Sequence, residues 1–327
     1  MNQKRLFSGA QPTGELHLGN YFGAIVNWVR LQETYDAIYC VVDYHAMTMD
    51  YEPKTMREKV YEVARGLLAC GLDPAKCTLF VQSEVPAHTE LAWILSTVSS
   101  MGRLQNMTQF KEKSEQNVEN VNLGLFAYPV LQAADILIYK AEAVPVGEDQ
   151  VQHLELSREV ARRFNARFGE TFPEPQQLLT SAPRIMGLDG KGKMSKSLNN
   201  YIGITETPDQ VWAKLAPAFT DPARKRRNDP GNPDICNIFT LHNQVSPPEL
   251  VAEINTACRT AQIGCVECKK RMAAHLNAML EPIRQRGREL AAHPDDVVDA
   301  LKAGGRRCLK LARETMAEVR RKTGLDA

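Results

Sequence analysis

Two short apolar runs flank an amphipathic helical pattern near the amino terminus, and this alternation sets the fold class. The runs span residues 37–43 and 77–82. Between them, residues 53–70 repeat their apolar side chains at helical spacing, and the pattern stops at Gly71. A strand, a helix and a second strand in this order predict parallel strands joined by a crossover helix. The sequence therefore predicts an α/β fold with a doubly wound, Rossmann-like parallel sheet.

The character of the chain changes after the lysine-rich stretch that ends at Ser197. Four later segments have helical patterns and are separated by breaks rich in Pro and Gly; they span residues 207–218, 247–262, 266–280 and 294–321. We therefore expect a Rossmann-like domain over 1–190, a loop over 191–200, a helical domain over 201–305, and a last helix over 306–327 that can pack back on the first domain.

Composition excludes some classes of protein. With 43% hydrophobic and 24% charged residues, the chain has the make-up of an ordinary globular protein. Its formal net charge of +1 means that contact with nucleic acid needs local basic patches. No apolar run approaches the roughly 20 residues of a membrane span, and the amino terminus has no signal-peptide core. We expect a cytoplasmic protein whose eight cysteines stay reduced or bind metal.

A glycine-containing turn over residues 8–20 is the first candidate ligand site. It follows a strand pattern around Leu6 and Phe7 and precedes a helical pattern over 21–31. Such a turn lets backbone approach a bound nucleotide, and the start of the following helix favours anionic phosphate. The imidazole of His17 and the amide of Asn20 add hydrogen-bond donors. Taken alone, such a turn is more often a plain strand–helix connection.

The second candidate is the lysine-rich run Lys193-Met194-Ser195-Lys196-Ser197. Its ammonium groups supply point charges to phosphate oxygens, and its hydroxyls supply donors. The glycines and small residues around it predict a loop that can close over a triphosphate. By itself such a run is more often a solvated turn, so its interpretation depends on the first motif.

Together the two motifs resemble the paired signatures of the class I aminoacyl-tRNA synthetases. Residues 13–20 read Thr-Gly-Glu-Leu-His-Leu-Gly-Asn and are similar to the HIGH signature, whereas residues 193–197 match the KMSKS signature letter for letter. The likeness covers nearly the whole chain. It is strongest to the bacterial tryptophanyl-tRNA synthetases, through residues 7–14 and 144–150.

The resemblance implies an enzyme that activates an amino acid with ATP and Mg²⁺ and transfers it to tRNA. In that reaction an ionised carboxylate attacks the α-phosphorus in line, so the protein positions the reactants and neutralises charge without a covalent nucleophile. The matching residues with this catalytic role are His17, Asn20, Lys111, Lys193 and Lys196. By the same likeness, the ATP contacts are Gln11, Pro12, Thr13, Gly19, Asn20, Gly147, Glu148, Asp149, Ile185, Lys193, Met194, Ser195, Lys196 and Ser197.

The resemblance also implies a pocket for L-tryptophan. Tyr128, Gln132 and Asp135 have spacings that place them on one face of a helix. In the tryptophanyl enzymes the residue that matches Asp135 accepts the indole N–H, which is the only hydrogen-bond donor of that ring. The implied pocket residues are Phe7, His45, Tyr128, Gln132, Asp135, Val144, Val146 and Gln150.

The related tyrosine enzymes are an alternative. Many bacterial tryptophanyl enzymes have Met where this chain has Gln132, and an aspartate accepts a phenol O–H as readily as an indole N–H. Phe7 favours tryptophan, because the tyrosine enzymes carry a Tyr there. Residues 147–150 also agree with the tryptophan group. We therefore expect tryptophan as the substrate, with Gln132 unexplained.

Four cysteines in the helical part are a feature that the ordinary family pattern does not require. Cys265 and Cys268 form a C-x₂-C pair, and Cys236 and Cys258 precede them. Four thiolates satisfy either tetrahedral Zn²⁺ or an iron–sulfur cluster. The spacing resembles a subset of bacterial tryptophanyl enzymes with a [4Fe–4S] cluster, so we expect that cluster, with Zn²⁺ as the alternative.

The resemblance thus implies a tryptophan–tRNA ligase that acts on tRNA(Trp), binds its anticodon through the helical domain over 201–305, and forms a homodimer. Basic residues at 224–227 and 269–271 are candidates for contact with RNA phosphates. Two further functions stay open: a tRNA-independent adenylyl-transfer enzyme similar to pantothenate synthetase, and a non-enzymatic iron–sulfur RNA-binding protein. The large helical domain disfavours the first, and the two intact signatures disfavour the second.

Overall fold

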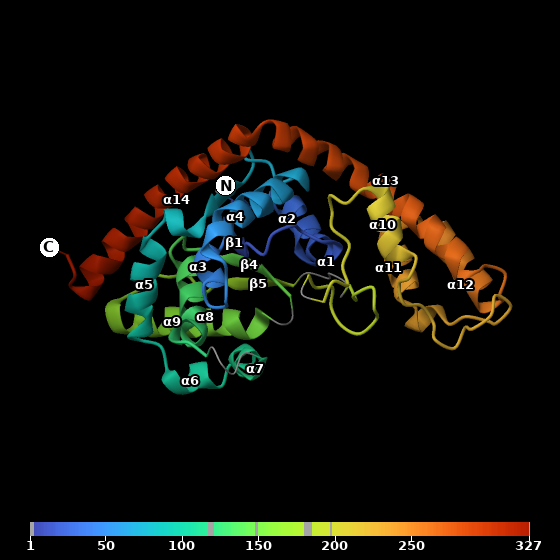
Figure 1. The fold of residues 1–327 in the computed structure, drawn as a ribbon. Coiled ribbons are helices and arrows are strands. Elements are labelled where there is room, and N and C mark those ends of the chain that lie inside the picture. The colour runs from blue at the N-terminus through green and yellow to red at the C-terminus, as the bar shows by residue number, and fades with distance from the viewer. Residues whose placement is uncertain (1–2, 117–120, 148–149, 180–184, 197, 327) are drawn as a thin grey trace. The chain divides into compact units, whose positions relative to one another are not determined.

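The parallel sheet expected from the sequence is present in the computed structural model (Figure 1). The structure describes residues 3–116, 121–147, 150–179, 185–196 and 198–326. Contacts divide the chain into two compact units. The sheet unit comprises Met1–Gly14, Asn27–Ser181 and His293–Ala327, and the helical unit comprises Glu15–Val26 and Ala182–Ala292. The domain boundaries that we expect from the sequence stay predictions.

Five parallel strands form the sheet in the order β3-β2-β1-β4-β5. The predicted strands at 37–43 and 77–82 are confirmed as β2 and β3. The order changes direction between β1 and β4, and ligands of open α/β sheets bind at the carboxyl ends of strands at such a point. The strands are β1 (Arg5–Ala10), β2 (Asp36–Val41), β3 (Thr78–Val81), β4 (Ala143–Val146) and β5 (Gln176–Leu179).

Helices cover both faces of the sheet, with α4 on one side and α8 and α9 on the other (Figure 1). The core between these layers contains Ile38, Phe80, Leu137 and Phe164, each fully buried. The predicted crossover helix over 53–70 is confirmed as α4. The helices are α3 (Asp43–Ala46), α4 (Pro53–Ala69), α5 (Ala87–Ser96), α6 (Met101–Gln105), α7 (Thr108–Gln116), α8 (Leu123–Leu137), α9 (Val151–Phe168) and α14 (Pro294–Thr323), with a 3-10 turn η2 (Gln82–Glu84).

Helix α14 returns to the sheet unit and crosses strand β3 at very short range. A Cβ atom added at Gly304 would lie 2.0 Å from the carbonyl oxygen of Leu79, so this position of the helix requires glycine. Three residues later, Arg307 donates to the Thr78 hydroxyl at 2.6 Å and also pairs with Asp36. The C-terminal helix is therefore part of the wall that supports β3.

The helical unit contains the start of the first helix and the segments between residues 185 and 292. The helix expected over 21–31 is interrupted, because residues Tyr21–Ile25 form a π-helical turn. The predicted end of α13 near residue 280 is wrong: the helix continues past Pro282, and buried Ile283 and Leu290 extend its apolar stripe. The elements of this unit are α1 (Leu18–Asn20), η1 (Tyr21–Ile25), α10 (Pro208–Leu215), η5 (Pro233–Ile235), α11 (Asn237–Val245), α12 (Pro248–Arg259) and α13 (Cys265–Ala292). Helix α2 (Val26–Leu31) follows η1 and belongs to the sheet unit from Asn27 on. Within the described ranges, no helix has the length and apolar character of a membrane span.

Candidate active site

The glycine-containing turn ends in a reciprocal cap at the start of α1. His17 is the N-cap residue, and its Nδ1 accepts a hydrogen bond from the Gly19 N–H at 3.1 Å. In return, the His17 backbone N–H donates to Oδ1 of Asn20 at 3.0 Å. Two side chains predicted to meet phosphate therefore also hold the backbone of the turn.

The hydrogen bonds of this cap determine which atoms of His17 and Asn20 can donate to a ligand. Because Nδ1 of His17 accepts a hydrogen bond, the neutral ring carries its proton on Nε2, which is then a donor. Because Oδ1 of Asn20 is also an acceptor in the cap, its amide Nδ2 is the atom with hydrogens to give. Burial, and then the charge of Lys196, lower the pKa of His17 to about 4. Both side chains thus supply neutral N–H donors at physiological pH.

The protonation of His17 can be measured by NMR on protein labelled with ¹⁵N-histidine. We expect an Nε2-protonated ring whose pKa is about 4 rather than its ordinary value of 6.5. Since protonation is disfavoured in the folded state, His17 contributes stability above pH 6.5 and loses that contribution as the pH falls toward 4. A His17→Gln variant assigns the signal. A ring that titrates near 6.5 would contradict the capped, buried geometry.

The lysine loop lies beside this turn within the helical unit. His17 pairs with Gly203 in an antiparallel bridge, and the Leu18 N–H donates to the Ile202 carbonyl at 3.0 Å. A Cβ atom at Gly19 would lie 2.9 Å from the His17 ring and 3.4 Å from Cβ of Met194, so glycine is needed where the two motifs meet. The structure therefore brings the two signature segments together.

Hydrogen bonds from Asn200 hold the lysine loop. Its Oδ1 accepts from the Ser195 N–H at 2.7 Å, and its Nδ2 donates to Asp189 at 3.0 Å. Lys193 is exposed and Lys196 is half-buried. Ser197 lies outside the described residues. The loop thus has a fixed base and carries ammonium groups that water can reach.

The other residues predicted to contact ATP are divided between the two units. Ile185, in the helical unit, is buried, and its carbonyl accepts from the Met194 N–H at 3.4 Å. In the sheet unit, Gln11 and Thr13 are exposed, Pro12 is buried and Gly147 is half-buried, close to the carboxyl ends of β1 and β4. Glu148 and Asp149 lie outside the described residues. Lys111 is exposed on α7, with its Nζ 3.5 Å from Oδ1 of Asn106.

Asp135 of α8 is the centre of a buried polar cluster in the sheet unit. It is 1% exposed, and its Oδ1 accepts from Nε2 of Gln82 at 2.8 Å and lies 2.6 Å from Nδ1 of His88. Its Oδ2 lies 2.7 Å from Nε2 of His45. Burial by itself would raise the pKa of Asp135, but interaction with His45, and then with His88, outweighs it and lowers the pKa to about 2. The carboxylate is therefore ionised and acts as an acceptor.

The other predicted pocket residues come from neighbouring elements of the sheet unit. The Tyr128 hydroxyl lies 2.7 Å from Nε2 of His153, and burial raises the pKa of this phenol to about 12. The Phe7 ring is buried and stacks on Tyr139 at 5.7 Å between centroids. Val144 and Val146 are buried in β4, Gln132 is half-buried on α8, and Gln150 is half-buried just before α9.

Sequence reasoning did not find Gln82, His88 and Tyr139, which complete the cluster around Asp135. Gln82 directly follows β3, and the carboxyl ends of parallel strands are where such folds bind ligands. Its place at the end of a predicted strand could therefore have identified Gln82 as a candidate site residue. His88 and Tyr139 had no comparable signal, because both meet their partners through tertiary packing: His88 reaches Asp135 where α5 packs against α8, and Tyr139, just after α8, meets His88 and Phe7.

The four cysteines gather where α11, α12 and α13 meet. Burial, and then interaction with the thiols of Cys236, Cys258 and Cys265, raise the pKa of Cys268 to about 12. Nη1 of Arg224 lies 3.8 Å from Sγ of Cys258 and 3.9 Å from Sγ of Cys265. The four thiols thus share one neighbourhood. Within the described part of the chain, no three or more His, Cys, Asp or Glu side chains form a ready metal site.

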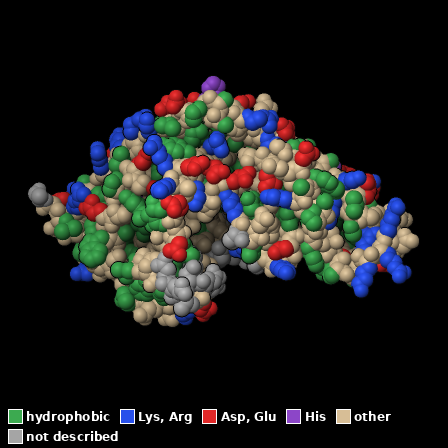
Figure 2. Space-filling model, viewed as in Figure 1, with side chains coloured by type: hydrophobic (Ala, Val, Ile, Leu, Met, Phe, Trp, Pro, Cys, Tyr) green, Lys and Arg blue, Asp and Glu red, His purple; other side chains and the backbone are tan. Residues whose placement is uncertain are grey.

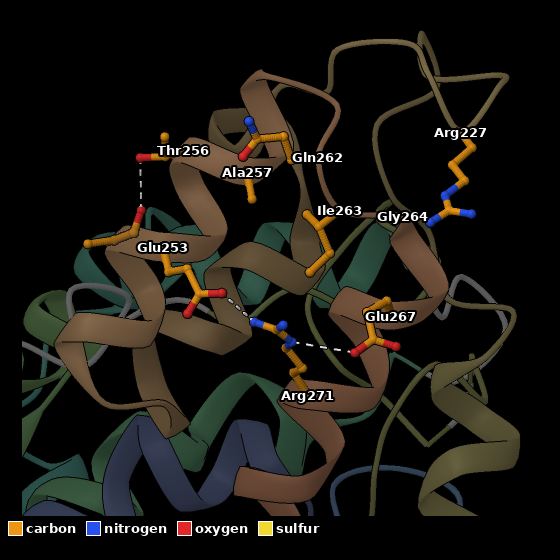
Figure 3. A pocket seen from close by; sticks show the side chains of 10 residues that line it. Arg227, Glu253, Thr256, Ala257, Gln262, Ile263, Gly264, Glu267 and Arg271 are labelled. Atoms are coloured by element: carbon orange, nitrogen blue, oxygen red, sulfur yellow. Dashed lines mark hydrogen bonds and ion pairs between the residues drawn. The ribbon is translucent and has the colours of Figure 1, made fainter.

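A cavity of about 620 Å³ lies next to these cysteines, between α12 and α13 (Figure 3). Arg271 points between Glu253, at 2.6 Å, and Glu267, at 3.4 Å. Lys269 is 6% exposed and donates to the carbonyls of Ala216 and Ala218. Arg224 is likewise used inside the unit, since it donates to the Ile263 carbonyl. Of the basic residues at 224–227 and 269–271, the exposed ones are Lys225, Arg226, Arg227 and Lys270.

Comparison with known proteins identifies the family. The model of the family described as tRNA synthetases class I (W and Y) matches residues 1–281. The chain belongs to this family of class I tRNA synthetases. A Deinococcus radiodurans protein named tryptophan–tRNA ligase is 53% identical to this synthetase over 325 residues, which are 98% of each chain. A tryptophan–tRNA ligase of Thermotoga maritima is 44% identical over 98% of this chain and 99% of its own.

Solved structures agree with the family and the fold. The tryptophanyl-tRNA synthetase of Campylobacter jejuni, solved with ADP and tryptophan, superimposes with a TM-score of 0.89 at 33% identity and covers 98% of this synthetase and 99% of its own chain. A tyrosyl-tRNA synthetase of Archaeoglobus fulgidus superimposes with a TM-score of 0.68 at 22% identity over 87% of this synthetase and 90% of its own chain. The second likeness shows the shared fold alone.

Proposed function

We propose that this synthetase is a tryptophan–tRNA ligase, which activates L-tryptophan with ATP and transfers it to tRNA(Trp). The observation that carries the proposal is the 53% identity, over 98% of both chains, to a relative with that activity in its name. The test is charging of a tRNA(Trp) transcript by the purified chain. We expect esterification with tryptophan, and failure to charge with any amino acid would overturn the proposal.

The activation step is an in-line displacement at phosphorus. A carboxylate oxygen of tryptophan forms a bond to the α-phosphorus of ATP, and the bond from that phosphorus to the bridging oxygen of pyrophosphate breaks. The pyrophosphate leaves with the electron pair, and tryptophanyl-adenylate remains. Since the attacking carboxylate is already ionised, no general base is required. Mg²⁺ bound to ATP would neutralise part of the negative charge of the phosphates, and the task of the protein's own residues is positioning and charge stabilisation.

The paired signature segments supply donors and positive charge for the phosphates. His17 and Asn20 present Nε2–H and Nδ2–H groups, because their other polar atoms are used in the helix cap. Lys193 and Lys196 add point charges from the loop, and their stabilisation of the transition state does not require a proton transfer. Lys111 is proposed to reach the triphosphate from α7. The fixed base of the loop, held by Asn200, supports closure of its lysine-bearing part over ATP.

The cluster around Asp135 is proposed to recognise the indole ring. An ionised, buried carboxylate needs donors, and the indole N–H supplies one. Phe7, Val144 and Val146 are proposed as apolar walls, and Tyr128 and Gln150 as the residues that hold the α-ammonium group. His45 contacts Asp135 directly, so it is proposed to border the ring rather than to take part in the chemistry.

We further propose that Cys236, Cys258, Cys265 and Cys268 bind a [4Fe–4S] cluster. The support for this proposal is that the thiol of Cys268 interacts with those of Cys236, Cys258 and Cys265, while Nη1 of Arg224 lies 3.8 Å from Sγ of Cys258 and 3.9 Å from Sγ of Cys265. When bound, the cluster joins these segments and stabilises the end of the helical unit. A protein in the cytoplasm, where thiols stay reduced, keeps these four cysteines available as ligands.

The cluster predicts a brown protein with broad visible absorption after anaerobic purification, with about four iron and about four sulfide per chain. Cys265→Ser should lose most of the iron and the colour, because one thiolate ligand is removed. The matched control is Cys70→Ser, a buried cysteine at the end of α4 in the sheet unit, which should keep both. A colourless protein with stoichiometric zinc would support the zinc alternative instead.

Contact with tRNA is proposed through the exposed basic side chains near α12. Figure 2 shows Lys and Arg side chains gathered over the part of the helical unit that carries α12. Among the exposed ones are Lys225, Arg226 and Arg227, which supply affinity that depends on salt but read little sequence. Combined Arg226→Ala and Arg227→Ala changes should raise the KM for tRNA and leave ATP–pyrophosphate exchange unchanged. A KM within error of wild type would remove these residues from the interface.

A homodimer is proposed through an apolar face of the sheet unit. A hollow of about 370 Å³ there is lined by Met47, Trp93, Tyr128 and Leu131, among others, and Trp93 is 75% exposed. Apolar side chains exposed to this extent mark interfaces. Analytical ultracentrifugation at micromolar concentration should find a dimer, and a monomer would contradict the proposed homodimer.

A further inference from the structure

We infer that His88 and Tyr139 are positioning residues that fix the carboxylate of Asp135 so that one acceptor position stays open for a substrate N–H. The inference rests on the proposed function, because it takes Asp135 as the group that receives the donor of the substrate ring. Neither residue touches the reacting atoms; both act through Asp135.

Acceptor capacity limits what Asp135 can bind. An ionised carboxylate has about four lone-pair positions, two on each oxygen. Among the described residues, Gln82 and His88 direct hydrogen bonds to Oδ1, which fills it. His45 directs one to Oδ2. Oδ2 therefore keeps one lone-pair position for a further donor, next to the His45 ring. The His45 ring itself packs edge-on to Tyr128, with 6.3 Å between ring centroids. A substrate ring with one N–H donor next to His45 would fill this last acceptor position of Asp135.

His88 fixes the orientation of the Asp135 carboxylate. Its ring is fully buried, Nδ1 lies 2.6 Å from Oδ1 of Asp135, and Nε2 lies 2.7 Å from the Tyr139 hydroxyl. The Phe80 ring stacks on it at 5.9 Å with an interplanar angle of 24°. Because Asp135 is ionised, Nδ1 must donate. In the neutral ring Nε2 then accepts from the Tyr139 O–H, so this phenol fixes the tautomer of the ring.

Tyr139 is itself held from two sides. Its ring stacks on Phe7 of β1 at 5.7 Å with an interplanar angle of 19°, and its hydroxyl interacts with the thiol of Cys308 on α14. Burial raises the pKa of this phenol far above its ordinary value, so the proton stays on oxygen. The C-terminal helix therefore supports a hydrogen-bonded chain from Cys308 through Tyr139 and His88 to Asp135.

Without the Tyr139 hydroxyl, Nε2 of the buried His88 ring has no hydrogen-bond donor. The ring can then adopt the other tautomer or flip. A lone pair on Nδ1 would then face Oδ1 of Asp135 and repel it. The carboxylate becomes free to rotate, so its open position is no longer aimed at one place. We expect weaker recognition of the ring N–H rather than a slower reaction at phosphorus.

The test compares tryptophan with its benzothiophene analogue, in which sulfur replaces the ring N–H, as substrates for ATP–pyrophosphate exchange. Wild type should prefer tryptophan by about 10³-fold in kcat/KM, because the analogue leaves Asp135 short of a donor. Tyr139→Phe should raise the KM for tryptophan about 10-fold, keep kcat within about 3-fold, and lower the preference at least 10-fold. Tyr39→Phe is the matched control, since Tyr39 is equally buried and its hydroxyl bonds the Trp28 carbonyl.

A second pair of variants tests the same point if Tyr139→Phe is unstable. His88→Asn keeps an N–H donor at the position of Nδ1 and should retain more of the preference than His88→Ala. A Tyr139→Phe enzyme, or a His88→Ala enzyme, with the wild-type preference and KM would overturn the inference. Absence of tryptophan-dependent exchange in wild type would overturn the proposed function instead, so the two failures are distinguishable.

Discussion

Asp135→Asn is expected to lower kcat/KM for tryptophan in ATP–pyrophosphate exchange by about 10³-fold or more. The amide has one acceptor oxygen in place of two, and its NH₂ group would face the donors of His45 or of Gln82 and His88. The indole N–H therefore loses its acceptor, and buried donors lose theirs. The loss should appear mainly in the KM for tryptophan, with the KM for ATP little changed.

The same change should lower stability at neutral pH. The pKa of Asp135 is lowered to about 2 in the folded protein, so its charge stabilises the fold above its ordinary value of 3.8 and loses that effect as the pH falls through about 2. Asp221→Asn is the control, because Asp221 is also buried and accepts two backbone N–H groups within the helical unit. An Asp135→Asn enzyme with a wild-type KM for tryptophan would contradict the role of this carboxylate.

Lys193→Ala and Lys196→Ala are each expected to slow adenylate formation by about 10²–10³-fold while tryptophan binds with nearly unchanged affinity. The reason is that their ammonium groups are proposed to meet charge that develops on the leaving pyrophosphate, which is absent when tryptophan binds. Rapid-quench measurement of the first turnover gives the rate, and equilibrium dialysis gives the affinity for tryptophan.

Lys191→Ala provides the control within the same loop. Lys191 is exposed like Lys193 and lies two residues before it, but it is outside the signature that we assign to phosphate. Its removal should leave the rate within about 3-fold of wild type. If the Lys193 and Lys196 variants lost tryptophan affinity and kept their activation rate, the loop could not be a phosphate clamp.

Local patterns were enough to predict a parallel sheet and helices such as α4, α10, α12 and α14. Strands such as β2 are short apolar runs, and α4 has a regular apolar stripe that ends before Gly71. The extension of α13 beyond Pro282 was missed, because residues after the proline are held in the helix by burial of Ile283 and Leu290 rather than by local preference. The π turn within the first helix likewise had no local signal.

For the candidate site as well, the sequence predicts part of the arrangement, and tertiary contacts determine the rest. Residues such as His17 and Asp135 could be named from motif spacing, but their atomic roles could not. The cap that leaves Nε2 of His17 as the donor depends on the backbone of Gly19. The partners of Asp135 come from residues 53 and 47 positions away, Gln82 and His88, so no local window contains them. Gln132, the residue left unexplained by the resemblance, is half-buried on α8, and nothing in the structure explains it.

The measurement that tests the central claim most directly is ATP–pyrophosphate exchange with the purified chain, with tryptophan and tyrosine as alternative substrates. We expect exchange that depends on tryptophan, with kcat/KM for tyrosine lower by about 10³-fold or more, because Phe7 has no hydroxyl to receive the phenol of tyrosine. Exchange that depends on tyrosine and not on tryptophan would contradict the account, and with it the assignment of Asp135 as the acceptor of the indole N–H.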